Sequence, residues 1–324
     1  MSAQMDPVFL NKEKIASLLS MNECISVMEE MFCSLSKGER LQPLRSMMWL
    51  PDKSGLLGMM PGYSIKDGVM GIKLISVFHA NSQSGHPSHQ GVVILFDAKH
   101  GQPLMMFDAG EITGIRTAAA SAVATKYLAR SDAEVLGIIG SGEQAERHVE
   151  SMMLVRKIKQ INVWSRNELN ALRLAEKMMN RHRVFLNVKK NASDAVQDAD
   201  IVCTVTSSQE PVVLADWIQP GTHVNAVGSS TPKARELDTA LITKSKLFTD
   251  CFESIFNEAG DFLIPKKEGV IGNDHVRAEL GDVILGMKKG RENRDEITVF
   301  KSLGIAAEDI SSCWQIYKKI NQKV

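Results

Sequence analysis

The 324-residue sequence lacks several features that would each indicate a particular class of protein. It has no apolar run near the roughly 20 residues that a membrane-spanning helix needs. Its first residues lack the basic-then-apolar order of a secretory signal. It carries 38 basic and 38 acidic residues, and the resulting net charge of zero argues against binding of nucleic acid or membrane surfaces through bulk charge. We therefore expect a cytoplasmic protein with neither nucleic-acid nor membrane partners.

Cysteines are few, and no metal-binding pattern is complete. The five cysteines are scattered, odd in number and without a C-x-x-C pair, which predicts reduced thiols rather than a disulfide framework. His79, His86 and His89 form H-x6-H-x2-H, but no cysteine or carboxylate completes a ligand set at metal spacing. We therefore expect no metal, and we interpret these histidines as neighbours of a cofactor ring or as plain loop residues. No G-x-S-x-G signature of a serine hydrolase is present either.

Two patterns of apolar residues divide the chain. Residues 12–37 have the spacing of an amphipathic helix, and 44–108 hold short apolar runs between Gly, Pro, Asp and Asn, which predicts strands and turns. An alanine-rich helix is predicted over 111–129. Beyond it, buried strands alternate with helices, which is typical of parallel βαβ units in a doubly wound sheet. We place the domain boundary near residue 128, and about 302–320 is helical again.

A glycine-rich loop follows the first buried strand of the alternating region. Gly140, Gly142 and Ala145 form G-x-G-x-x-A between the strand "VLGII" and the helix "EQAERH". The first glycine permits a tight turn, the second lets the backbone approach a pyrophosphate, and the small third residue lets helix and strand pack. The helix N-terminus also faces the negative charge. In this context the pattern predicts a dinucleotide-binding (Rossmann) domain.

The end of the second strand indicates which dinucleotide is bound, because it meets the adenosine ribose. Here the residues are Ser165, Arg166 and Asn167, and no carboxylate follows until Glu168. An acid at this position would accept a hydrogen bond from the 2′-hydroxyl and favour NAD, whereas a guanidinium fits a 2′-phosphate by charge and by its forked donors. We expect NADP(H), with NAD(H) as the alternative if Arg166 only covers the adenine or lies in solvent.

Three cations lie within apolar surroundings in the first part of the chain. Arg45 is in "LQPLRSMMWL", Lys73 is in the strand "GVMGIKLISVF", and Arg116 is in the helix "TGIRTAAASA". A buried charge is costly unless it is paired or hydrated. The face that carries Lys73 is therefore either the wet side of a half-buried sheet or a site, and snorkelling or a plain salt bridge explains any one cation alone. Together they suggest a pocket for a small carboxylate.

These motifs together resemble the ornithine cyclodeaminase/μ-crystallin family, and its μ-crystallin-like members most of all. The matching stretches span most of the chain: MPGYS (60–64), PSHQ (87–90), ITGIRTAAASAVATKYL (112–128), GSGEQAERH (140–148), NAVGSSTPKARELD (225–238) and VFKSLGIAAED (299–309). The resemblance implies an α/β fold with a Rossmann NAD(P)-binding domain, residues 128–301, inserted into an N-terminal α+β dimerisation and substrate domain, residues 1–127 with 302–324. It also implies a homodimer.

The resemblance also implies roles for individual residues. It assigns Arg45, Lys73, Arg116 and Leu303 to the substrate and its surroundings. To the cofactor it assigns Ser88, His89, Thr113, Arg116, Gly140, Gly142, Glu143, Gln144, Ser165, Arg166, Asn167, Thr206, Ser207, Val227, Ser229 and Ser302.

One position departs from the family's cyclodeaminases, which carry an aspartate where this chain has Ser230. A hydroxyl does not pair with a substrate ammonium as a carboxylate does, and losing a charge-assisted bond of about 1.5–3 kcal/mol costs roughly one to two decades in turnover or binding. The resemblance therefore favours NAD(P)H-dependent reduction of small cyclic ketimine carboxylates, of the pyrroline- or piperideine-2-carboxylate type, to L-cyclic amino acids. Its catalytic residues would be Arg45, Lys73, Arg116 and Ser230. The alternatives are an ornithine cyclodeaminase with bound NAD, an alanine-dehydrogenase-like enzyme, and a non-catalytic protein that binds a thyroid-hormone-like ligand.

Overall fold

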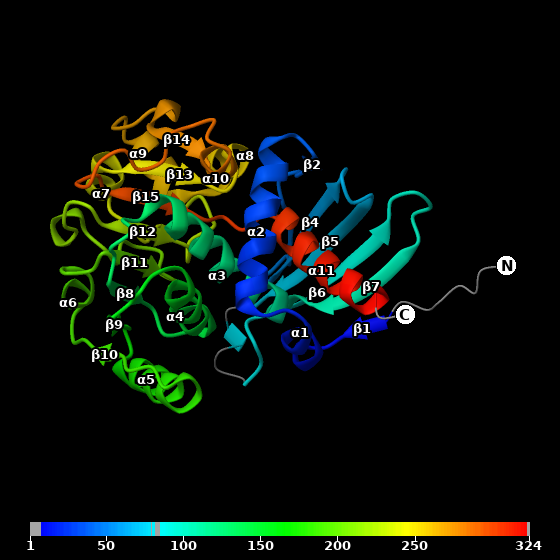
Figure 1. Cartoon of the computed structure of the whole chain (residues 1–324), viewed down its shortest axis with the longest axis horizontal. Helices are drawn as coiled ribbons and strands as arrows, with labels where there is room; N and C mark the ends of the chain where they lie inside the picture. The colour runs from blue at the N-terminus through cyan, green and yellow to red at the C-terminus, as the bar shows by residue number, and fades with distance from the viewer. Residues whose placement is uncertain (1–7, 79, 82–84, 323–324) are drawn as a thin grey trace. The chain divides into compact units, whose positions relative to one another are not determined.

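The computed structural model describes residues 8–78, 80–81 and 85–322, so His79 of the histidine pattern lies outside the described residues (Figure 1). The chain divides into two compact units, Met1–Arg116 with Ile305–Val324, and Thr117–Gly304. The sequence placed these boundaries after residues 127 and 301. The first boundary falls instead inside helix α3 (Ala109–Leu128), because apolar periodicity locates the ends of a helix but not the point along it where packing changes.

The first unit contains one mostly antiparallel sheet in the order β1-β7-β6-β5-β4-β2, with β3 paired to β4. Only β1 runs parallel to its neighbour β7. The strands are β1 (Val8–Leu10), β2 (Arg40–Leu41), β3 (Ser46–Trp49), β4 (Leu56–Ser64), β5 (Val69–Val77), β6 (His89–Asp97) and β7 (Pro103–Asp108). The sequence predicted β3 to β7. It missed β1 and β2, which span three and two residues and are too short to show an alternating pattern.

The predicted helix over residues 12–37 is wrong, because the chain breaks there into α1 (Lys12–Leu18) and α2 (Met21–Ser36). Ser20 begins the second helix, since its Oγ accepts a hydrogen bond from the Glu23 amide at 3.4 Å. The apolar spacing continues through the break, so periodicity alone did not detect it.

Helix α11 (Ala306–Asn321) packs on α2 and on strands β4, β5 and β6, and Figure 1 shows it in red across those strands. Gly62 and Gly71 lie opposite each other in the β4–β5 pair. A Cβ at Gly62 would come within 2.8 Å of Ile310 Cδ1, and one at Gly71 within 3.0 Å of Ile310 Cγ1. The two glycines therefore let α11 lie close to the sheet.

The second unit is built on an eight-stranded parallel sheet in the order β10-β9-β8-β11-β12-β15-β13-β14. Its strands are β8 (Val135–Ile139), β9 (Gln160–Trp164), β10 (Asn187–Val188), β11 (Ile201–Thr204), β12 (His223–Ala226), β13 (Lys246–Thr249), β14 (Val276–Glu279) and β15 (Thr298–Lys301). The helices are α4 (Glu143–Val155), α5 (Glu168–His182), α6 (Ala192–Val196), α7 (Thr239–Lys244), α8 (Phe252–Glu258), α9 (Gly260–Lys267) and α10 (Leu280–Ile284). The predicted α/β fold with a doubly wound sheet is confirmed.

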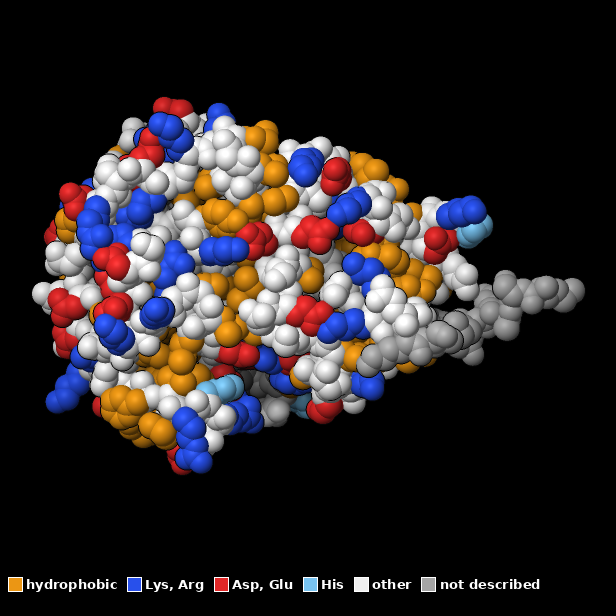
Figure 2. All heavy atoms as spheres, viewed as in Figure 1, with side chains coloured by type: hydrophobic (Ala, Val, Ile, Leu, Met, Phe, Trp, Pro, Cys, Tyr) orange, Lys and Arg blue, Asp and Glu red, His pale blue; other side chains and the backbone are white. Residues whose placement is uncertain are grey.

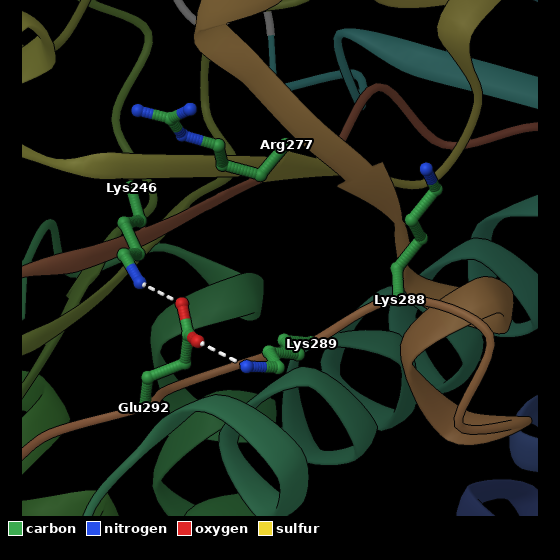
Figure 3. Close-up of a pocket in the computed structure, with 5 residues that line it drawn as sticks. All are labelled: Lys246, Arg277, Lys288, Lys289 and Glu292. Carbon is green, nitrogen blue, oxygen red and sulfur yellow. Dashed lines mark hydrogen bonds and ion pairs between the residues drawn. The ribbon is translucent and has the colours of Figure 1, made fainter.

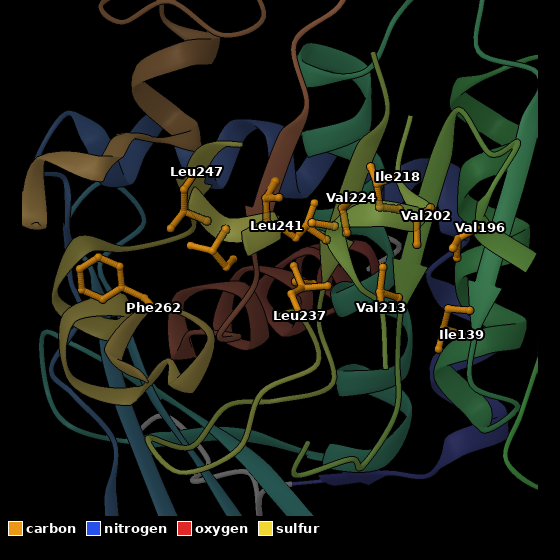
Figure 4. Close-up of a cluster of buried hydrophobic side chains, with 14 of the residues drawn as sticks. Ile139, Val196, Val202, Val213, Ile218, Val224, Leu237, Leu241, Leu247 and Phe262 are labelled. Carbon is orange, nitrogen blue, oxygen red and sulfur yellow. The ribbon is translucent and has the colours of Figure 1, made fainter. Parts of the chain in front are cut away.

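Strand order in this sheet reverses between β8 and β11, which is where doubly wound folds place a ligand crevice, at the carboxyl ends of the strands. The central strands β11 and β12 are buried on both faces, and β12 carries two buried polar side chains, His223 and Asn225, within that core. Figure 4 shows part of the core, in which Val202 and Val224 from the sheet pack in one cluster with Leu237.

The surface agrees with the balanced charge of the sequence. On the face shown in Figure 2, basic and acidic side chains are interspersed, without an extended region of one sign. Among the described residues, no helix is long and apolar enough to cross a membrane. All five cysteines are free thiols, and four of them are buried.

Candidate active site

Lys73 lies on a buried face of the first unit rather than on a wet one. Its side chain, on β5, is 3% exposed. The ammonium Nζ lies 2.8 Å from Asp309 Oδ2 on α11 and donates a hydrogen bond to Thr113 Oγ1 on α3 at 3.5 Å. Because a buried cation requires a partner, the burial of this lysine depends on α11 returning to the sheet. The interpretation of Lys73 as a solvated sheet residue is thereby excluded.

Arg116 belongs to the same buried cluster. Its Nε donates to Asp309 Oδ1 at 2.9 Å, and its Nη1 donates to Glu308 Oε2 at 2.6 Å. Arg116 is 3% exposed, and both carboxylates are fully buried. One carboxylate, Asp309, thus contacts both Arg116 and Lys73. Glu308 and Asp309 lie in the family stretch 299–309, but no role was predicted for them.

Burial and charge shift the pKa values in this cluster in different directions. Burial lowers the pKa of Lys73 to about 8; Asp309 opposes this shift, whereas Arg116 and Arg45 add to it. Burial also acts to lower the pKa of Arg116, but Asp309 and Glu308 outweigh it, and the pKa is raised. For Asp309 burial acts to raise the pKa, but Arg116 and Lys73 outweigh it and lower the pKa. Arg116 and Asp309 therefore stay ionised, while Lys73 changes charge near pH 8.

The remaining predicted residues of the first unit are placed as follows. Arg45 is half-buried just ahead of β3, and it acts electrostatically on Lys73. Ser88 and His89 meet at the start of β6, with Ser88 Oγ 2.9 Å from His89 Nδ1. Thr113 lies on α3 beside Lys73. Arg45, Lys73, Thr113 and Arg116 thus form one group.

The glycine loop of the second unit has the local geometry that a pyrophosphate requires. Gly140 has φ +124°, and a Cβ there would lie 2.8 Å from the Val205 carbonyl oxygen, so only glycine fits. Gly142 caps α4 without a side-chain hydrogen bond, and nothing lies within 4 Å of where its Cβ would be. This helix N-terminus is open to close approach by an anion, so the residues fit a dinucleotide.

The end of β9 differs in one respect from the expectation for a ribose site. Ser141 Oγ donates to Ser165 Oγ at 2.8 Å, which links the loops after β8 and β9. The Arg166 side chain is exposed. Asn167 caps α5, since its Oδ1 accepts a hydrogen bond from the Leu169 amide at 3.1 Å. The side-chain oxygen of Asn167 therefore already accepts a hydrogen bond within the protein, and its side-chain NH₂ group is the part that can donate to a ligand.

Glu236 joins the loops that follow β11 and β12. Its carboxylate accepts hydrogen bonds of 2.7 Å from Thr204 Oγ1, from the amide and Oγ1 of Thr206, and from the Gly228 amide. Burial raises the pKa of this fully buried carboxyl, and Lys301 opposes the shift. The predicted cofactor residue Thr206 is thus anchored through Glu236. Glu236 was not predicted as a site residue, because a single acidic residue after a loop carries no local signal of burial.

The other predicted residues of the second unit also follow strand ends. Ser207 lies after β11, and Val227, Ser229 and Ser230 lie after β12, where Ser229 Oγ donates to the Ala234 carbonyl. Ser302 and Leu303 follow β15 and are buried. Within the part of the chain that the structure describes, Ser302 Oγ makes no hydrogen bond. A buried hydroxyl without a partner is costly, so this oxygen fits a position that a bound cofactor would satisfy.

A pocket of about 310 Å³ in the second unit is lined by Lys246, Arg277, Lys288, Lys289 and Glu292. Lys246 begins β13, so this pocket lies at an amino end of the sheet, opposite the ends that carry the predicted cofactor residues. Figure 3 shows Lys246 and Lys289 directed at Glu292, at 2.6 and 3.0 Å, while Arg277 and Lys288 point away from it. The cations do not converge on one point, so we do not regard this pocket as the active site. No group of three or more potential metal ligands exists within residues 8–78, 80–81 and 85–322.

Comparison with known proteins connects these features to a family. The family model described as "Ornithine cyclodeaminase/mu-crystallin family" matches residues 5–324. The ketimine reductase mu-crystallin of Mus musculus is 37% identical over 315 residues, which cover 96% of each chain.

Solved structures agree with this match. The Thermococcus litoralis Δ1-pyrroline-2-carboxylate reductase, in complex with NADH and L-proline, has a TM-score of 0.94 and 39% identity, with 97% of this chain and 98% of that chain covered. An archaeal alanine dehydrogenase dimer with bound NAD has a TM-score of 0.92 and 32% identity, with 99% and 98% covered. The chain therefore belongs to the ornithine cyclodeaminase/mu-crystallin family, as its motifs predicted.

Proposed function

We propose that this protein is an NAD(P)H-dependent reductase of small cyclic ketimine carboxylates, of the pyrroline- or piperideine-2-carboxylate type. The observation that carries the proposal is the buried cluster of Lys73 and Arg116 around Asp309, in a chain related to a ketimine reductase and to a pyrroline-2-carboxylate reductase. A cation cluster inside the protein suits a substrate that brings its own carboxylate.

In this proposal Arg45 and Arg116 bind the substrate carboxylate, and Leu303 adds apolar surface at the substrate. Lys73 polarises the imine or passes a proton to its nitrogen, for which a pKa of about 8 is suited. The cofactor, when bound, supplies the hydride that C2 of the imine receives. The reduced ring then carries a secondary amine and is an L-amino acid. The residues that would hold the cofactor are Ser88, His89, Thr113, Arg116, Gly140, Gly142, Glu143, Gln144, Ser165, Arg166, Asn167, Thr206, Ser207, Val227, Ser229 and Ser302.

Ser230 distinguishes this reaction from cyclodeamination. It lies after β12 and offers a neutral hydroxyl, which does not pair with the side-chain ammonium of ornithine as a carboxylate does. A cyclic imine has no such ammonium, so its reduction requires no acid at this position. Ser230 therefore supports a reductase over an ornithine cyclodeaminase.

The test is a panel of five- and six-membered cyclic imine carboxylates, with NADPH or NADH followed by absorbance. We expect stoichiometric consumption of the reduced cofactor and formation of the cyclic amino acid. Ornithine alone should release no ammonia, and pyruvate with ammonia should oxidise the cofactor far more slowly than an imine does. Ammonia release from ornithine without activity on any imine would refute the proposal, and preference for pyruvate with ammonia would favour an alanine dehydrogenase.

We further propose that NADPH is preferred over NADH because Arg166 follows β9 where the ribose 2′-phosphate would lie. Replacement by aspartate, Arg166→Asp, should lower kcat/KM for NADPH by about 10–100-fold, the effect of losing one charge-assisted bond of about 1.5–3 kcal/mol. kcat/KM for NADH should change little or rise. Arg173→Asp, on the exposed side of α5, serves as the control and should leave the NADPH/NADH ratio unchanged. Equal losses for both cofactors in Arg166→Asp would contradict this role.

The exposed apolar side chains support a homodimer, and the free thiols support a cytoplasmic location. Met47, Met48 and Trp49 of β3 are 39%, 54% and 48% exposed, and Leu41 of β2 is 56% exposed. Such adjoining apolar side chains favour an interface, and the related archaeal alanine dehydrogenase is a dimer. The five free thiols suit a reducing compartment. We therefore propose that two copies associate through the first unit.

A further inference from the structure

Asp309 contacts two of the residues that are proposed to act at the substrate, Lys73 and Arg116. It lies in the first turn of α11, is fully buried, and contacts Lys73 Nζ at 2.8 Å through Oδ2 and Arg116 Nε at 2.9 Å through Oδ1. Two cations from β5 and α3 are thus held by one carboxylate from a third element. If Asp309 were removed, the buried charges of Lys73 and Arg116 would lose the carboxylate that they share, which is energetically costly.

Asp309 also determines which donors remain for a ligand. Asp309 takes the Nε–H of Arg116, and Glu308 takes one N–H of Nη1. The Nη2 group makes no hydrogen bond to any described residue. The Lys73 ammonium has three donors, of which one bonds Thr113 Oγ1, while Asp309 Oδ2 forms an ion pair with it at 2.8 Å. Lys73 and Arg116 therefore each keep N–H groups that can donate to a ligand. The position of Asp309 determines the direction in which those N–H groups point.

We propose that Asp309 is the positioning residue of this site: it directs the Lys73 ammonium and the Arg116 guanidinium toward the substrate, and touches neither substrate nor cofactor. This inference rests on the proposed reductase function. The conformation of Lys73 follows from Asp309 rather than from the substrate, so the site is preorganised before the substrate binds.

Asp309 should also influence the charge state of Lys73. The charged and titratable groups that act on Lys73 are Asp309 on α11, Arg116 on α3 and Arg45 ahead of β3. Cys313 lies one turn after Asp309, and the charges of Asp309 and Lys73 both act on its thiol. Burial, followed by the charge of Asp309, raises the pKa of Cys313 well above its ordinary value, so this thiol stays neutral. Asp309 is the only anion among the three charged groups, so its removal should shift the titration of Lys73 to lower pH.

The test compares Asp309→Asn with Glu308→Gln in the full-length enzyme. Both variants neutralise a buried carboxylate of the same cluster, but only Asp309 contacts Lys73. For Asp309→Asn we expect KM for pyrroline-2-carboxylate to rise about tenfold or more, and the alkaline limb of kcat/KM to move by about one pH unit or more to lower pH. For Glu308→Gln we expect a rise in KM with a much smaller shift of that limb. Equal shifts in both variants, or no shift in Asp309→Asn, would overturn the proposal.

A second readout separates this inference from the proposed reaction. L-Proline binding to the wild type and the variants can be measured by calorimetry without turnover, and we expect Asp309→Asn to weaken it about tenfold or more. Unchanged proline affinity in Asp309→Asn overturns the positioning role even if the enzyme reduces imines. Wild-type proline binding that depends on Asp309, without reduction of any imine, would instead refute the reductase function alone. If Asp309→Asn does not fold, the variant Asp309→Glu can be used, because it retains the negative charge but displaces it. We expect this variant to raise KM, with a smaller shift of the alkaline limb of kcat/KM. An unchanged KM in Asp309→Glu would also overturn the proposal.

Discussion

Replacing Lys73 with methionine should lower kcat/KM for pyrroline-2-carboxylate by about a thousandfold or more. Methionine retains the length and apolar stem of lysine but removes the ammonium, which lies 2.8 Å from Asp309 on the buried face of β5. In the proposed reaction this ammonium polarises the imine and passes a proton to its nitrogen, so the variant would lose both a charge-assisted contact and a proton source. The measurement is steady-state oxidation of NADPH, with cofactor affinity determined separately by fluorescence.

The matched control is Lys66→Met, at an exposed lysine paired with Glu30 on the surface of the same unit. That variant should retain wild-type activity to within about twofold. Comparable losses in the two variants would show that Lys73 acts through general stability rather than at the site.

The pH profile of the wild type provides a check on the same residue. Burial lowers the pKa of Lys73 to about 8, so its protonated form predominates below that pH and is lost above it. The protonated imine is also the better electrophile. We therefore expect kcat/KM to fall as pH rises through about 8, and a profile that rises with pH through neutrality would contradict the role of Lys73 as an ammonium.

Truncation of Glu236 to alanine should have the largest effect on stability, lowering the free energy of unfolding by about 3–5 kcal/mol. Four donors, one at the end of β11 and three in the loops after β11 and β12, would lose their acceptor, and each unmet buried donor costs about 1 kcal/mol or more. Because Thr206 and Gly228 lie in those loops, NADPH affinity should fall together with stability. Urea unfolding followed by circular dichroism, and titration with NADPH, measure the two effects.

Two further variants define what the carboxylate contributes. Glu236→Gln retains one acceptor oxygen in the same shape and should lose less stability than alanine does. Glu210→Ala, at an exposed glutamate nearby in the sequence, should change the free energy of unfolding by less than about 0.5 kcal/mol. An unchanged free energy of unfolding in Glu236→Ala would contradict the view that this residue holds the loops together.

The loops of the nucleotide-binding unit could be predicted because their signals are local. The pattern Gly140-x-Gly142-x-x-Ala145 determines a turn, a close approach and a helix start within six residues, and the observed α4 begins within it at Glu143, directly after Gly142. The helix predicted from Asn167 is α5, with Asn167 as its cap. The two-residue β2 carries no such signal, and the capping pattern Ser20-x-x-Glu23 at the break between α1 and α2 was not used, so neither feature was predicted.

The sequence by itself determined the family, the alternating β and α elements, the dinucleotide loop and the three unusual cations, since each follows from residue type and short spacing. Only the tertiary structure decided how those cations are balanced. Arg116 and Asp309 lie 193 positions apart, and nothing in either segment predicts their contact. The contact exists because Gly62 and Gly71 let α11 lie close to the sheet, which brings Asp309 to Lys73. Burial of charge is a property of the assembled unit, because the cost of desolvation depends on every surrounding atom rather than on the neighbours in the chain.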